Sequence, residues 1–122
     1  MGDSLKAFMN DLRVTKGLAY YVGNFTLDKN PFVYDEYLDN VGVFCNFNGT
    51  NGSTTFTDVK GKTITPVGDV YISTPQYDFN YSSCRLNGPG AYLSIGASSD
   101  FDFGSGDFTV ECWFKVDNLS RQ

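Results

Sequence analysis

Residues 108–116 have the sequence FTVECWFKV, and this stretch decides the fold class. Apolar and polar side chains alternate along it without a break, which is the two-residue period of a β-strand with one buried face. One side carries an apolar row and the other a mostly polar row with a tryptophan. The apolar row is Phe108, Val110, Cys112, Phe114 and Val116, and the polar row is Thr109, Glu111, Trp113 and Lys115.

Shorter stretches of the same kind precede it. In FMNDLRV (8–14) the alternation sets Phe8, Asn10, Leu12 and Val14 on one face; in VGVFCNF (41–47) it sets Val41, Val43, Cys45 and Phe47 on one face. Further short strands are expected at 54–58, 62–66, 70–73, 82–86 and 91–96, between turn sequences such as NGTNGS (48–53) and NGPG (87–90). No segment has a convincing helical period. The sequence predicts an all-β, antiparallel sandwich or barrel.

The composition fits a β protein and restricts its partners. Aromatic residues make up 16% of the 122 residues, and such residues suit pleated sheets. A net charge of −5 without a basic cluster argues against nucleic acid and against an anionic membrane surface. The chain contains no histidine, which excludes His-based zinc sites and His-dependent catalytic triads. We expect no membrane insertion and no signal peptide, because no long apolar run occurs and MGDSLKAFMN lacks the basic-then-apolar order.

The order of these strands resembles a known family. DFDFGSGDFTVECWFKVDNLS (100–120), SSCRLNGPGAYLSI (82–95) and VGVFCNFNGTNGSTTFTDVKGKTITPVGDVYIS (41–73) are similar to the first strands of laminin-G-like, concanavalin A-like jelly rolls of phage tail and virion proteins. The resemblance covers residues 41–119. Residues 8–32 resemble the last strand and aromatic tail of the same domain. The chain therefore looks like a family C-terminal piece (1–32) followed by an N-terminal piece (33–122), expected to form one compact unit.

The family's middle strands have no counterpart here, which leaves two alternatives: a piece cut from a tandem array, or a circularly permuted domain. Residues 17–40 are expected to form an extended connector held by its aromatic residues, with a break at Lys29-Asn30-Pro31. We predict that residues 8–14 pair antiparallel with residues 41–47, placing Leu12 and Val14 beside Val43 and Cys45. The missing middle should leave an open edge or face, which favours an oligomer.

The resemblance implies a non-enzymatic virion module for adhesion or glycan recognition, extracellular after release of the particle. Its partners would be virion proteins or copies of itself, and a cell-surface glycan. The alternative is a structural or decoration domain that contacts other virion subunits and no sugar. A glycan hydrolase fragment is a remote third candidate, because Glu111 stands alone on its face whereas glycosidases need two carboxylates.

Trp113, Glu111 and Lys115 are the candidate carbohydrate-binding residues. A tryptophan on a polar sheet face can stack on a sugar ring while Glu and Lys bind its hydroxyls. The alternative is that another segment or subunit covers this face and Trp113 only packs.

No cofactor is expected, and calcium is the alternative that stays open. Asp100, Asp102 and Asp107 have a spacing that suits calcium, but Phe101 and Phe103 interrupt them and no bidentate glutamate follows, which favours turn-forming carboxylates. Cys45, Cys84 and Cys112 lie far apart on apolar strand faces, so all three are expected to be unbonded and buried.

Overall fold

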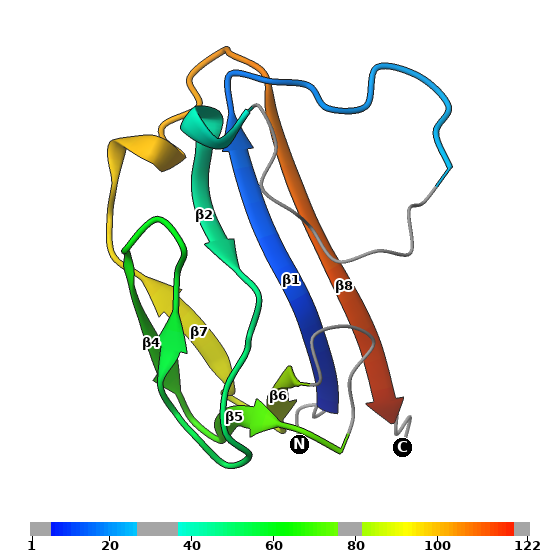
Figure 1. The fold of residues 1–122 in the computed structure, drawn as a ribbon, viewed down its shortest axis with the longest axis vertical. Coiled ribbons are helices and arrows are strands. Elements are labelled where there is room, and N and C mark those ends of the chain that lie inside the picture. Colours follow the sequence, from blue (N-terminus) through cyan, green and yellow to red (C-terminus); the bar gives the residue numbers. More distant parts are fainter. Residues whose placement is uncertain (1–5, 27–36, 76–81, 119–122) are drawn as a thin grey trace.

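Two long strands, β1 and β8, organise the protein. The structure is a computed structural model that describes residues 6–26, 37–75 and 82–118. The strands are β1 (Lys6–Lys16), β2 (Val41–Cys45), β3 (Phe56–Thr57), β4 (Thr63–Val67), β5 (Val70–Ser73), β6 (Ser83–Asn87), β7 (Tyr92–Ile95) and β8 (Phe108–Asn118). Two single-turn 3₁₀ helices, η1 (Leu38–Asn40) and η2 (Ser99–Phe101), are the helical elements of these ranges (Figure 1).

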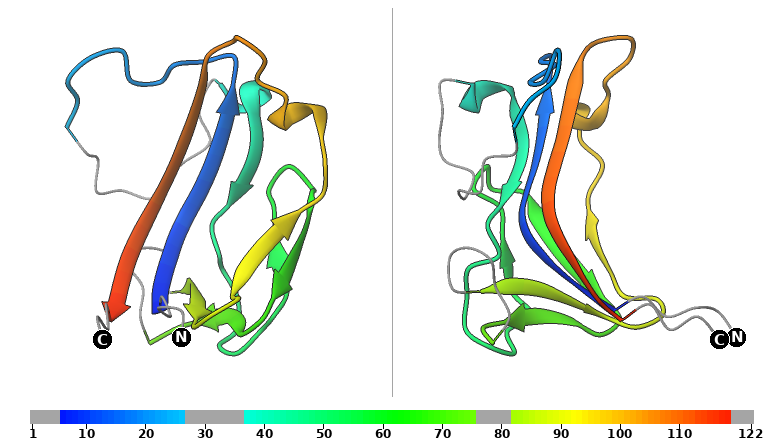
Figure 2. Two further views of the ribbon diagram at one scale, coloured as in Figure 1. Left: turned by 180° about the vertical axis from the view of Figure 1, so that it is seen from behind. Right: turned by 90° about the vertical axis from the view of Figure 1, so that its right-hand side faces the viewer.

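The strands form an antiparallel β-sandwich of two sheets, as the alternating sequence predicts. Sheet A has the order β2-β1-β6-β5, with β8 on the other edge of β1. On the edge of β1 away from β8, the N-terminal half of β1 pairs with β6 and its C-terminal half pairs with β2. Sheet B is smaller and has the order β3-β4-β7. Seen from behind, β7 is the strand of sheet B nearest to β1 and β8 (Figure 2).

The predicted pairing of residues 8–14 with residues 41–47 is confirmed for Leu12, Arg13 and Val14, whereas Phe8 and Met9 pair with β6 instead. β1 and β2 are antiparallel within one chain, and Leu12 lies opposite Cys45 while Val14 lies opposite Val43. These cross-strand neighbours form part of one apolar layer.

The predicted alternation of β1 is wrong on one point, because the strand contains a bulge. The register with β8 shifts between Asn10 and Arg13, and Asp11 has a positive φ of 45°. The extra residue reverses the faces, so Met9 joins Leu12 beside sheet B, whereas Phe8 and Asn10 lie on the opposite side. A strict period of two cannot reveal such an insertion.

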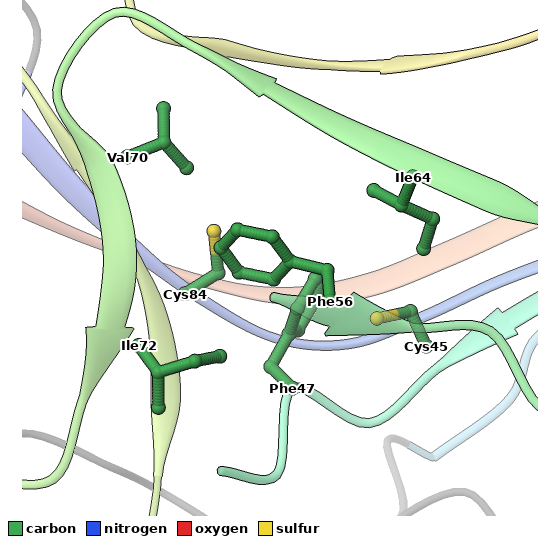
Figure 3. Packing of buried hydrophobic residues seen from close by; sticks show 7 residues of the cluster. All are labelled: Cys45, Phe47, Phe56, Ile64, Val70, Ile72 and Cys84. Carbon is green, nitrogen blue, oxygen red and sulfur yellow. The ribbon is translucent and has the colours of Figure 1, made fainter. Parts of the chain in front are cut away.

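The core lies between the two sheets and includes residues of β5 and β6 (Figure 3). Its cluster of buried residues draws on both sheets and on the segment after β2, and comprises Cys45, Phe47, Phe56, Ile64, Val70, Ile72 and Cys84. Phe47 and Phe56 meet edge to face, with ring centroids 6.2 Å apart. The backbone amide of Phe44 and that of Lys62 both donate to the buried carboxylate of Asp58, which fixes the turn between β3 and β4 against β2.

The connector after β1 is held by aromatic side chains where it is described, as expected. Tyr20 packs edge-on against Tyr37, with centroids 5.7 Å apart, which ties its two ends together. The predicted break at residues 29–31 lies outside the described residues. None of the helices in the described ranges has the length and apolar character needed to span a membrane.

Candidate functional site

β8 presents two faces of different character, and both are candidates for binding. Its register with β1 sets Val14 beside Val110 and Met9 beside Phe114 on the side of sheet B. The same register sets Arg13 beside Glu111 and Asn10 beside Trp113 on the other side. The structure therefore places Trp113, Glu111 and Lys115 on one face, as the sequence predicts.

Glu111 is buried in a polar network on that face. Arg13 donates from Nε at 2.8 Å and from Nη2 at 2.7 Å to its Oε2, and the hydroxyl of Tyr21 donates to Oε1. The ion-paired side chains are only 7% and 8% exposed. Both carboxylate oxygens are thus already engaged within the protein, which leaves Glu111 little capacity to bind a sugar hydroxyl.

The start of the connector covers this end of the polar face. The hydroxyl of Thr109 donates to the carbonyl of Leu18 and accepts from the backbone amide of Tyr20. The ring of Tyr20 lies under the guanidinium of Arg13, 4.7 Å from centroid to carbon. The sequence predicted the aromatic connector. It did not predict that Tyr20 and Tyr21 contact the ion pair of Arg13 and Glu111.

Trp113 and Lys115 lie farther along the same face. Trp113 is half-buried, and its neighbour Asn10 donates from Nδ2 to the carbonyl of Ser82 at 2.7 Å. Lys115 is exposed. Of the three predicted carbohydrate-binding residues, Trp113 and Lys115 keep accessible surface, whereas the carboxylate of Glu111 is enclosed.

The carboxylates on this face are too far apart for glycosidase chemistry. Glu111 and Asp117 are six residues apart on one strand, or about 20 Å at the extended rise of a strand. Glycosidases place their two carboxyl groups roughly 5–10 Å apart. Asp117 also accepts from Arg85, 2.9 Å away, and that guanidinium lies over the ring of Phe8.

The opposite face of β8 exposes its apolar row. Phe108 is 52% exposed, Val110 55%, Phe114 48% and Val116 38%. The neighbouring positions on β1 are covered, since Ala7 and Val14 are buried. Sheet B therefore packs over β1 but does not extend over β8. The apolar side of β8 is thus an open face among the described residues.

The expectation that all three cysteines are buried is wrong for Cys112. All three are free thiols, but Cys112 is exposed in the middle of the apolar row, whereas Cys45 and Cys84 are buried. Burial raises the pKa of Cys45 and that of Cys84 to about 12, and to a lesser extent raises the pKa of Cys112. The alternation places Cys112 correctly on the apolar side of the strand. It cannot show that no second layer covers that side.

The aspartates of residues 100–107 do not gather around a common centre. Asp100 forms an ion pair with Lys62 and accepts a hydrogen bond from the hydroxyl of Ser98, the N-cap of η2, and these hydrogen bonds lower its pKa. Within the described ranges, no three His, Cys, Asp or Glu side chains lie close enough together to hold a metal ion.

Comparison of the chain with protein-family models, with curated proteins and with solved structures finds no match. The proposed function therefore rests on the two faces of β8.

Proposed function

We propose that the protein is a non-enzymatic assembly module that binds another protein subunit through the apolar row of β8. The laminin-G-like resemblance implies two functions, and the proposed one is the structural function. The resemblance suggests that the assembly is a virion. The observation that carries the proposal is the exposure of four large apolar side chains in one continuous row. Contiguous apolar surface of this kind marks interaction sites.

Covering this row contributes favourable free energy to binding. Complete burial of a Val or Phe side chain stabilises by about 1.5–3 kcal/mol, so covering the exposed half of each of the four yields about 4 kcal/mol in total. In the described part of the chain β8 pairs only with β1, so a strand of the partner can add backbone hydrogen bonds along the other edge of β8.

Cross-linking from Cys112 tests the proposal. A benzophenone maleimide attached to this exposed thiol should, on illumination in the native assembly, link the chain to the protein that covers the row. Phe114→Lys should abolish the cross-link because a charge would be buried in the contact. Thr65→Lys, a matched change on the exposed outer side of β4, should leave it intact. Absence of any protein cross-link, or equal yields from both variants, would refute an assembly role for this face.

Glycan recognition is the second candidate, and one observation favours it. Tyr21 and Phe25 stack with centroids 4.0 Å apart, both are exposed, and the hydroxyl of Tyr21 donates to Glu111. Exposed aromatic platforms next to polar groups suit sugar rings. On a glycan array, Phe25→Ala and Trp113→Ala should each remove a signal that the unmodified protein gives. No signal from the unmodified protein, with the fold intact by circular dichroism, argues against this candidate.

A further inference from the structure

We infer that the subunit covering the apolar row is a second copy of the same chain, and that two copies complete each other's sandwich about a two-fold axis parallel to the strands. The inference rests on the proposed function, because it names the protein that the row binds.

The gap in each copy has a definite shape. Sheet B ends at β7, whose inward residues Leu93 and Ile95 pack against the core cluster together with Met9 and Leu12 of β1. Beyond β7, no strand of the described residues occupies the next position of that layer, opposite β8. A segment that fills this position must lie about 10 Å from β8 and must present an apolar strand face toward it. It must also have a strand edge that can lie beside the free edge of β7.

β8 of another copy meets these three requirements. It carries an apolar row on one face, and its outer edge pairs with no strand of the described residues. When β8 of one copy lies over β8 of the other, each copy supplies the layer that the other lacks. The outer edge of each β8 then lies beside the free edge of the partner's β7.

The strand directions permit these two edges to pair. β6 and β8 both run antiparallel to β1, and β7 follows β6 through the tight turn at residues 87–90. β7 and β8 therefore run in opposite directions, as their arrows show (Figure 1). A two-fold axis parallel to the strands preserves strand direction, so the pairing of β8 with the partner's β7 is antiparallel.

The apolar row supplies part of the buried surface that a stable dimer needs. Phe108 and Phe114 together expose the equivalent of one aromatic side chain, about 200 Å², and the two valines add about 100 Å². Stable interfaces bury about 800 Å² per partner. The apolar row thus supplies more than a third of that area, and the two pairs of joined edges contribute in addition. Pairing of two β8 edges side by side would leave both apolar rows in water, which disfavours that alternative.

Sedimentation velocity combined with thiol labelling tests the inference on the full chain. Because Cys45 and Cys84 are buried, Cys112 is the thiol that reacts quickly. The protein should sediment as a dimer, and the labelling rate of Cys112 should fall at least 10-fold as the concentration rises through the dissociation constant. Phe114→Lys and Val110→Lys should each sediment as monomers and label one thiol per chain at every concentration, with an unchanged circular dichroism spectrum. Thr65→Lys should behave like the unmodified protein.

Two results would overturn the inference. One is a monomer at all concentrations with a constant Cys112 labelling rate; if cross-links from Cys112 then lead to a different protein, the proposed function stands and only the second copy is refuted. The other is a dimer that forms equally in Phe114→Lys and Val110→Lys, because the contact between copies would then lie on another face of the protein.

Discussion

At the scale of single residues, the three thiols differ in chemistry because they differ in burial. Cys45 and Cys84 lie in the cluster of buried residues, where desolvation of the thiolate is the largest cause of their raised pKa. The carboxylates of Asp58 and Asp11 raise the pKa of Cys45 further. These two thiols therefore act as small hydrophobic side chains.

The raised pKa of these thiols predicts a loss of stability at alkaline pH. In the unfolded chain a thiol ionises near its ordinary pKa of 9.0, whereas in the folded chain it stays protonated until about pH 12. The unfolded state therefore binds fewer protons between these values, and the free energy of unfolding falls as pH rises through this window. Urea denaturation between pH 8 and 11 should show a steeper fall for the unmodified protein than for the double variant Cys45→Ala/Cys84→Ala. Parallel curves would contradict the role of the thiols.

The ion pair of Arg13 and Glu111 makes a second prediction at this scale. Glu111→Gln leaves the buried guanidinium without its counter-charge, and should lower the free energy of unfolding by about 3–5 kcal/mol. The double variant Arg13→Met/Glu111→Leu removes both charges and should lose distinctly less. Chemical denaturation of the two variants measures the difference. A double variant that is less stable than Glu111→Gln would show that packing, not the uncompensated charge, governs this pair.

At the scale of elements, local backbone geometry sets which side chains face the core. The bulge at Asp11 allows both Met9 and Leu12 to face sheet B, although they are three residues apart. Tight glycine turns then return the chain from one sheet to the other. Gly68 ends β4 with a φ of 76°, and the turn at Gly90 packs directly against it.

This close approach predicts an unusual cost for Gly68→Ala. A Cβ atom there would lie 2.7 Å from the carbonyl oxygen of Gly90, so the backbone of one turn must move. Gly52 has a similar positive φ of 82° but open space around it, and provides the control. Gly52→Ala should cost about 1 kcal/mol from backbone strain alone, and Gly68→Ala about 1–3 kcal/mol more from the clash. Equal losses in thermal denaturation would show that the two turns do not pack tightly together.

At the scale of the whole molecule, the two sheets are unequal and the interior is incompletely filled. A mostly apolar cavity of about 210 Å³ lies between β1 and β7, lined in part by Met9, Leu12, Leu93 and Ile95. It borders the part of sheet A where the cover ends. The molecule is thus a sandwich that is well packed at one end and thin along β8.

A sandwich completed by a second copy should be more stable when it is concentrated. A 100-fold excess of partner over the dissociation constant stabilises by about 2.7 kcal/mol, which corresponds to several degrees in the melting temperature of a chain of this size. Calorimetry over a 100-fold range of concentration should show this rise for the unmodified protein. Phe114→Lys should melt at one temperature throughout, close to that of the unmodified protein at high dilution. A concentration-independent melting temperature of the unmodified protein would contradict dimerisation.

Much of the fold was accessible from the sequence because strand alternation and turn residues are local properties. The alternation of residues 108–116 specified β8 and its two faces, and the turn sequences separated the short strands. The order of the family-like segments also predicted that the first strand pairs with residues 41–47. Both strands have an apolar face and backbone amides that need a partner, and pairing side by side satisfies both.

Only the tertiary structure decided what covers each face. The alternation that buries Cys45 in β2 is the same that exposes Cys112 in β8, because a two-residue period distinguishes one side of a strand from the other and carries no information about a second layer. The enclosure of Glu111 by Arg13 and Tyr21 likewise depends on residues about 90 positions away in the chain. Burial is set by contacts between distant segments. For that reason the sequence by itself determined the strands and their faces, and the packing of the sheets determined which of those faces remain free to bind.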